Sequence, residues 1–125
     1  MLSGRKVHAT IPTADLQRAM GWYESKLGLK PSAVQPQGAI YEMGEGTGFM
    51  LYPTSNAGKA PNTLMSIASS DARADIKALQ AKGVVFEEYD MPGLKTENGV
   101  AMLGDAPGGW FKDVDGNIIG IFEGP

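Results

Sequence analysis

The sequence predicts an α+β fold in which two βαβββ modules form one domain of 125 residues. Three observations favour this fold. An apolar stripe of helical period follows the first strand-like run, the same order of strand and helix occurs again in the second half, and both predicted helices end at a glycine. The helices begin 56 residues apart, at Asp15 and Asp71, and their glycines Gly28 and Gly83 lie 55 apart. We therefore expect a duplicated unit whose two copies bury their apolar faces together.

The first module is expected over residues 5–54. Its helix, residues 15–27, follows from apolar side chains at helical spacing, with Thr13 or Asp15 as the N-cap and Gly28 as the C-cap. Alternating or short apolar runs between proline and glycine turns predict the strands. The expected strands are residues 6–11, 32–35, 39–43 and 49–52.

The second module is expected over residues 62–125, after a polar linker at about residues 54–61 that shows no periodicity. Its helix, residues 71–82, has three inward apolar side chains and ends at Gly83. A loop is expected around residues 91–93. The expected strands are residues 63–68, 84–89, 100–103, 110–112 and 118–122.

Composition excludes several classes of protein. The chain has no cysteine, which excludes a disulfide scaffold, a thiolate zinc site, an iron–sulfur cluster and a cysteine nucleophile, and fits the reducing cytoplasm as the expected location. The net charge is -3 and no basic run interrupts the chain, so we expect no nucleic-acid partner. No apolar run is long enough to predict a signal peptide or a membrane span, and we expect no membrane partner.

Three segments, in order along nearly the whole chain, resemble the vicinal oxygen chelate superfamily, the family of glyoxalase, extradiol dioxygenases, fosfomycin-resistance enzymes and bleomycin-binding proteins. Residues 8–28 carry a histidine on the first strand and a Trp-Tyr pair before the capping glycine. Residues 78–84 form the end of the second helix. Residues 110–119 are similar to the closing aromatic-x-D-P-D-G-N hairpin of the family, with Val114 in place of the usual proline. The resemblance implies a glyoxalase/bleomycin-resistance-like fold, in which curled mixed sheets surround a cleft.

The resemblance also implies four metal-ligand positions on four strands of that cleft, where a divalent ion chelates two neighbouring substrate oxygens. In this chain the positions fall on His8, Leu51, Leu64 and Gly120. Only His8 offers a usual ligand, and one imidazole cannot hold a divalent ion at useful affinity. A register slip that brought in Glu123 would still leave two ligands. We therefore expect no bound metal and no other cofactor.

Strand alternation from these positions predicts an apolar and aromatic cleft lining, which is typical of small-molecule sites. Trp110 and Lys112 belong to this cleft lining if residues 114–116 form a three-residue hairpin loop with a left-handed Gly116. A two-residue loop would instead turn Phe111 toward the cleft. The expected ligand-binding residues are His8, Phe49, Leu51, Leu64, Ser66, Trp110, Lys112, Gly120 and Phe122.

The sequence favours a metal-independent protein that binds an apolar or aromatic small molecule and has no enzymatic role. A homodimer is expected because each module is a half-open sheet whose edge and inner face need a partner. One alternative is a lyase or isomerase of a small carbonyl compound, with His8 as the catalytic acid or base. Others are a metal-dependent enzyme like glyoxalase or the dioxygenases, and a structural or regulatory dimer whose cleft is filled.

Overall fold

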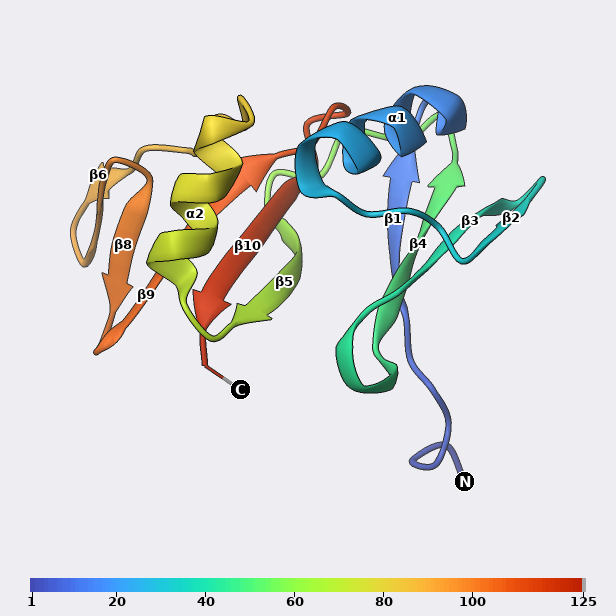
Figure 1. The fold of residues 1–125 in the computed structure, drawn as a ribbon, viewed down its shortest axis with the longest axis horizontal. Coiled ribbons are helices and arrows are strands. Elements are labelled where there is room, and N and C mark those ends of the chain that lie inside the picture. The colour runs from blue at the N-terminus through green and yellow to red at the C-terminus, as the bar shows by residue number, and fades with distance from the viewer. Residues whose placement is uncertain (125) are drawn as a thin grey trace.

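The computed structural model describes residues 1–124 and contains two helices and two sheets (Figure 1). The first half contains β1 (Ala9–Thr13), α1 (Leu16–Leu27), β2 (Ala33–Gln35), β3 (Gly38–Glu42), the short 3-10 turn η1 (Gly44–Gly46) and β4 (Gly48–Pro53). The second half contains β5 (Thr63–Ser69), α2 (Ala72–Ala81), β6 (Asp90–Met91), β7 (Leu94–Glu97), β8 (Val100–Leu103), β9 (Ala106–Lys112) and β10 (Ile118–Glu123).

Both sheets are mixed, and both place the first strand of the module beside its last. The first sheet has the order β1-β4-β3-β2, with β1 parallel to β4. The second has the order β5-β10-β9-β8-β7-β6, with β5 parallel to β10. The other neighbouring strands are antiparallel. This architecture confirms the predicted α+β fold with two mixed sheets. The first module has the order β-α-β-β-β, whereas the second has five strands after its helix, two more than that unit.

The helices begin and end where local signals in the sequence place them. The Asp15 side chain accepts a hydrogen bond from the Arg18 backbone N–H at 3.1 Å, and Gly28 ends α1 with a φ of 70°. Asp71 caps α2 in the same way, with the Ala74 N–H as donor at 3.1 Å. Gly83 follows the end of α2 with a φ of 90°. The two caps of α1 confirm the prediction, since a left-handed φ strongly favours glycine. The C-cap of α2 was predicted at Gly83 but is Lys82, one residue earlier.

The second module departs from the prediction between its helix and β8. Residues 84–89 were expected to form a strand, but they make only one isolated bridge, between Phe86 and Phe111. β8 takes the edge of β9 at Ala106–Gly108, so residues 84–89 meet only the far end of β9. The loop expected around residues 91–93 is instead the turn of the short β6–β7 hairpin.

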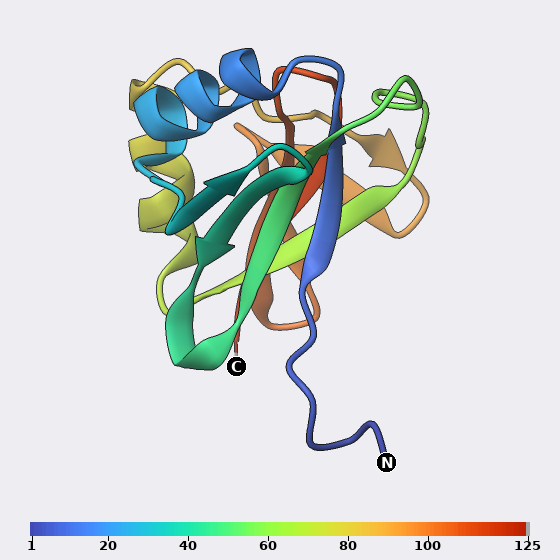
Figure 2. The ribbon, with the colours of Figure 1, turned by 90° about the vertical axis from the view of Figure 1, so that its right-hand side faces the viewer.

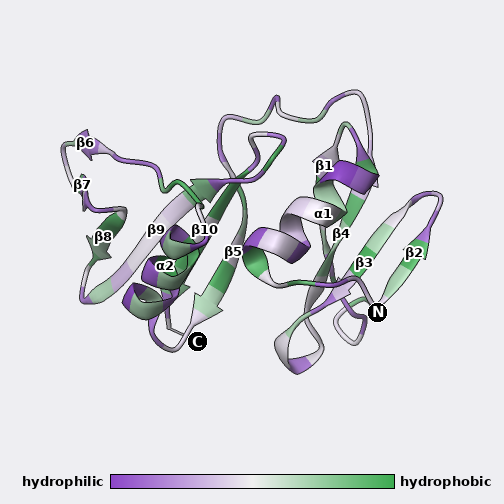
Figure 3. Ribbon diagram, turned by 45° about the horizontal axis from the view of Figure 1, so that its top comes forward, coloured by the Kyte–Doolittle hydropathy of each residue, from purple (hydrophilic) through white to green (hydrophobic). Residues whose placement is uncertain are grey.

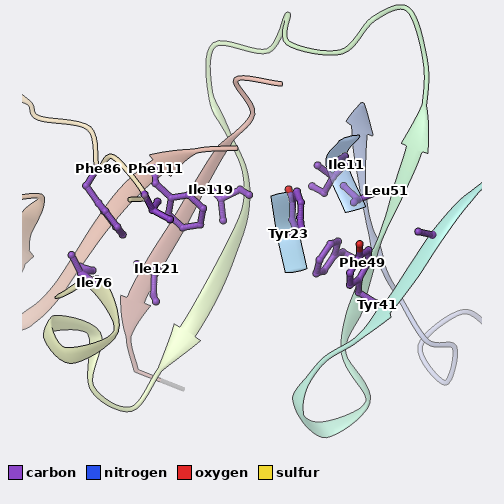
Figure 4. Packing of buried hydrophobic residues seen from close by; sticks show 13 residues of the cluster. Ile11, Tyr23, Tyr41, Phe49, Leu51, Ile76, Phe86, Phe111, Ile119 and Ile121 are labelled. Atoms are coloured by element: carbon purple, nitrogen blue, oxygen red, sulfur yellow. The ribbon is translucent and has the colours of Figure 1, made fainter. Parts of the chain in front are cut away.

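Both helices lie on the same side of the two sheets, which leaves the other side, here called the uncovered face, without a helix (Figure 2). α2 alternates hydrophilic and hydrophobic bands, as expected of a helix with one buried side (Figure 3). Beneath the helices one core joins the modules, with Tyr23 of α1 between residues of the two sheets (Figure 4). Trp22 stacks on Phe111 of the second sheet, with ring centroids 6.5 Å apart.

A buried carboxylate also joins the modules. Asp113, only 6% exposed, lies in the turn between β9 and β10 and accepts four hydrogen bonds. The donors are the Tyr23 hydroxyl at 2.6 Å, Asn117 Nδ2 at 2.9 Å, and the backbone N–H groups of Asp115 at 2.9 Å and Asn117 at 3.0 Å. Asn117 Nδ2 also donates to the Pro12 carbonyl at 2.8 Å. Burial and the charge of Asp113 raise the pKa of Tyr23 far above its ordinary value, so this hydroxyl stays a donor.

The helices are too short or too polar to span a bilayer: within residues 1–124 none reaches the length and apolar character that a membrane crossing needs.

Candidate functional site

The register of β9 and β10 decides which side chains point to the uncovered face of the second sheet. Gly120 lies opposite Trp110, and Ile118 lies opposite Lys112. Gly116 has a φ of 86° in the intervening turn, as the three-residue loop predicts. Trp110 and Lys112 therefore share a face with Gly120, while Phe111 points into the core.

Ser66 and Phe122 lie on the same face. Ser66 of β5 lies opposite Gly120, and Phe122 lies opposite Gly108 of β9. Five of the nine predicted ligand-binding residues are thus brought together on three adjacent strands. They are Ser66, Trp110, Lys112, Gly120 and Phe122.

Phe49 and Leu51 do not share a face with His8, and that part of the prediction was wrong. Ala9 lies beside Phe49 and Ile11 beside Leu51, so these two β4 side chains point into the core with exposures of 2% and 0%. The expected position on β4 was displaced by one residue, which reverses the direction of every side chain in the strand. Leu64 of β5 is half-buried and packs against the same core.

His8 lies at the exposed start of β1, over Gly48 of β4. A Cβ added at Gly48 would lie 2.8 Å from Cδ2 of the His8 ring. Thr10, two residues on, lies beside Met50. His8 therefore borders the uncovered face of the first sheet, whereas the five residues named above lie on the second sheet.

Three aromatic rings form a cluster on the uncovered face of the second sheet. Trp110 makes edge-to-face contacts with Tyr89 at 5.5 Å and with Phe122 at 5.4 Å between ring centroids. We call Tyr89, Trp110 and Phe122 the aromatic cluster. All three rings are only half-buried, so part of their surface is open to solvent.

Two glycines allow the Phe122 ring to lie flat on the sheet. A Cβ added at Gly108 would lie 2.3 Å from Cδ1 of this ring, and one at Gly120 would lie 2.4 Å from Cε2. Neither glycine has a left-handed φ, so the close approach of the ring is the reason that a side chain is excluded. The Phe122 ring therefore occupies the space above these two strands that side chains at Gly108 and Gly120 would fill.

A groove of about 610 Å³ lies next to the cluster, between the start of β1, the β3–β4 turn and β5. Its walls are mainly apolar, and its polar residues include Ser66, which also lies on the face of the aromatic cluster. The apolar lining residues include Met43, Phe49, Met65 and Ile67, and the polar ones include Glu45, Thr47 and Ser66. Phe49 thus lines this groove although its ring is almost wholly buried.

Sequence reasoning did not place Tyr89, Glu87 or Gly108 among the site residues, although it noted the acidic charge of residues 87–90 beside the expected rim loop. Glu87 and Tyr89 are two residues apart in a run expected to be a strand, which indicates one shared face. The bridge between Phe86 and Phe111 decides whether this shared face points to the core or to the uncovered side. No pattern among neighbouring residues in the sequence predicts that contact.

The residues present do not fit the metal site that the resemblance implies. On the uncovered face of the first sheet, the residues nearest His8 in the strand register are Thr10, Gly48 and Met50, and Glu42, opposite Gly48 on β3, is the one carboxylate of that row. Among residues 1–124, no three side chains of His, Cys, Asp or Glu lie close enough together to hold a metal ion. Leu64 and Gly120 in the second module offer no donor atom.

Several solved structures share this fold. A glyoxalase/bleomycin resistance protein/dioxygenase from Alicyclobacillus acidocaldarius is 18% identical, with a TM-score of 0.71 over 96% of this chain and 91% of that one. TnmS3, an antibiotic-binding protein from Streptomyces sp. CB03234, is 21% identical, with a TM-score of 0.64 over 100% of this chain and 99% of that one. A fosfomycin resistance protein from Listeria monocytogenes is 14% identical, with a TM-score of 0.69 over 100% and 96% of the two chains.

No curated protein sequence matches the chain. The family model described as the Glyoxalase/Bleomycin resistance protein/Dioxygenase superfamily, however, matches residues 5–121. This match covers nearly the whole chain and confirms the resemblance seen in the sequence. The chain belongs to the Glyoxalase/Bleomycin resistance protein/Dioxygenase superfamily.

Proposed function

We propose that this protein binds an apolar or aromatic small molecule on its aromatic cluster without the help of a metal ion. The observation that carries the proposal is the half-buried group of three rings on a sheet face that no helix covers. Exposed apolar groups gathered in this way mark interaction sites. A stacking contact contributes about 0.5–1.5 kcal/mol beyond area burial, so two contacts support micromolar binding when apolar burial is added.

Two relatives support a small molecule as the ligand. One solved structure of this fold is an antibiotic-binding protein, and another is a fosfomycin resistance protein. The groove of about 610 Å³ beside the cluster has the volume of an ordinary small-molecule site. His8 shares its row with one carboxylate, Glu42, and within residues 1–124 no third metal-ligating side chain joins them, which supports binding through packing instead of chelation. Catalysis by His8 as an acid or base stays a prediction.

Trp110→Ala is expected to weaken the binding of an aromatic ligand at least tenfold, because Trp110 contacts both other rings of the cluster. A panel of aromatic metabolites and antibiotics, followed by calorimetry, supplies the ligand and the measurement. The matched control is Trp22→Phe, which alters the other tryptophan of the chain, on the helix side of the sheets. A ligand that binds Trp110→Ala as well as the unchanged protein would show that the cluster is not the site.

We also propose a homodimer in which a second copy covers the uncovered face of the first sheet, so that the aromatic cluster on the second sheet stays open to a ligand. The two sheets of one chain lie side by side instead of face to face (Figure 1), so the chain leaves one side of both sheets open. Two apolar side chains, half-buried within one chain, lie on that side of the first sheet: Met50 and Tyr52. The cytoplasm is retained as the proposed location, since the chain has no cysteine.

Sedimentation equilibrium at micromolar concentration is expected to give twice the mass of one chain. The physical reason is that a second copy removes these apolar residues from water. Met50→Glu, which places a charge among them, is expected to shift the mass toward one chain. A mass of one chain for the unchanged protein at this concentration would contradict the homodimer.

A further inference from the structure

The three strands at the aromatic cluster, β5, β9 and β10, contain one cation, and that cation is already paired. Within their bounds, β5, β9 and β10 contain two charged residues, Lys112 and Glu123. Glu123 accepts a hydrogen bond from the Ala72 backbone N–H of α2, so its carboxylate lies on the helix side. Lys112 lies two residues from Trp110 on the uncovered face, and its Nζ is 3.1 Å from Oε1 of Glu87.

The backbone holds Glu87 in place beside the cluster. Phe86 bridges Phe111, and the Glu87 N–H donates to the Trp110 carbonyl at 2.7 Å. Because Phe86 and Phe111 both point into the core, their neighbours Glu87 and Trp110 point to the uncovered face. The carboxylate of Glu87 is therefore fixed next to the surface on which a ligand would lie.

The ion pair remains accessible to a ligand. The side chains of Lys112 and Glu87 are 54% and 27% exposed. An anionic group brought beside Trp110 would meet Lys112, but it would also meet the like charge of Glu87 at 3.1 Å from the same Nζ. A neutral group beside Trp110 meets no such repulsion, because the opposite charges of Lys112 and Glu87 largely cancel beyond the ion pair itself.

We propose that Glu87 sets the charge preference of the site: by pairing with Lys112, it makes the aromatic cluster select neutral arenes over arenes that carry a carboxylate. This inference rests on the proposed function. It assigns Glu87 as a specificity-determining residue, and it predicts that Lys112 becomes an anchor for anions once Glu87 loses its charge.

The test compares two probes of equal shape, naphthalene carboxylate and naphthalene carboxamide, by calorimetry at low salt. The unchanged protein is expected to bind the carboxamide more tightly. Glu87→Gln is expected to tighten binding of the carboxylate about fivefold or more, since it removes one repulsion and frees one cation, and to leave the carboxamide within about twofold. The gain is expected to shrink at high salt, because exposed charges are screened.

Two further variants separate a local effect from a general one. Glu97→Gln on β7 makes the same change of net charge at an exposed residue next to Thr96, and it is expected to leave both probes unchanged. Adding Lys112→Met to Glu87→Gln is expected to abolish the gain for the carboxylate.

The outcomes distinguish this inference from the proposed function. If the carboxamide binds and Glu87→Gln does not tighten the carboxylate, the inference is overturned while the proposed function stands. If Glu97→Gln tightens the carboxylate as much as Glu87→Gln does, the effect is one of net charge and the inference is likewise overturned. If neither probe binds any variant, the proposed function fails for arenes of this size and the inference fails with it.

Discussion

Replacing Asp113 by Asn is expected to lower the free energy of unfolding by about 3–5 kcal/mol. The Asp113 carboxylate is buried and accepts four hydrogen bonds, and an amide has one oxygen fewer to accept them. The amide nitrogen would instead face donors, either the Tyr23 hydroxyl and Asn117 Nδ2 or two backbone N–H groups. Buried donors without an acceptor cost about 1–3 kcal/mol each.

Urea denaturation followed by circular dichroism measures this loss. Asp105→Asn, the same chemical change at an exposed residue, is the control and is expected to stay within about 0.5 kcal/mol. If Asp113→Asn does not fold, Tyr23→Phe provides the measurement, because it removes only one of the four bonds and should cost about 1–2 kcal/mol. A cost below about 1 kcal/mol for Asp113→Asn would mean that this carboxylate does not join the modules.

Gly120→Ala is expected to weaken the binding of an aromatic ligand at least tenfold while the protein stays folded. The added Cβ would lie 2.4 Å from Cε2 of Phe122, at the free end of its side chain, so the ring can move away from the sheet. The flat placement of the Phe122 ring beside Trp110 would then be lost. The expected change in the free energy of unfolding is about 1 kcal/mol, at the low end of overpacking costs.

Gly109→Ala is the matched contrast, since Gly109 is the neighbour of Gly108 on the same strand but faces the core. Its Cβ would lie 2.3 Å from the Gly99 carbonyl oxygen, a backbone atom that cannot rotate away. This variant is expected to lose about 3 kcal/mol or more of stability. Calorimetric titration and urea denaturation of both variants check the pair. Unchanged ligand binding by Gly120→Ala would show that the flat placement of Phe122 has no part in recognition.

The elements whose signals are local could be predicted from the sequence. Asp15 and Asp71 are N-caps and Gly28 lies at a left-handed φ, because capping depends on residues within one turn of each other. The turn at residues 113–117 is equally local, and its left-handed Gly116 fixes the register of β9 against β10. That register is why Trp110 and Lys112 could be placed on one face with Gly120.

The pairing of strands far apart in the sequence could not be predicted in the same way. The register of β1 against β4 joins residues about 40 positions apart, such as Ile11 and Leu51, and no turn connects them. A displacement of one residue was enough to place Phe49 and Leu51 on the wrong face. Glu87 and Tyr89 could not be placed in the site for the same reason, since their position depends on the bridge between Phe86 and Phe111.

The two tryptophans allow a direct test of the proposed ligand site, because Trp110 lies on the uncovered face and Trp22 lies on the helix side. The measurement is the ¹⁵N–¹H correlation spectrum of the two indole N–H groups during titration of an aromatic ligand, first with EDTA and then without EDTA and with added zinc or nickel. The account predicts a saturable shift of the Trp110 signal and little change at Trp22. A shift confined to Trp22, or a Trp110 shift that requires added zinc or nickel, would contradict it.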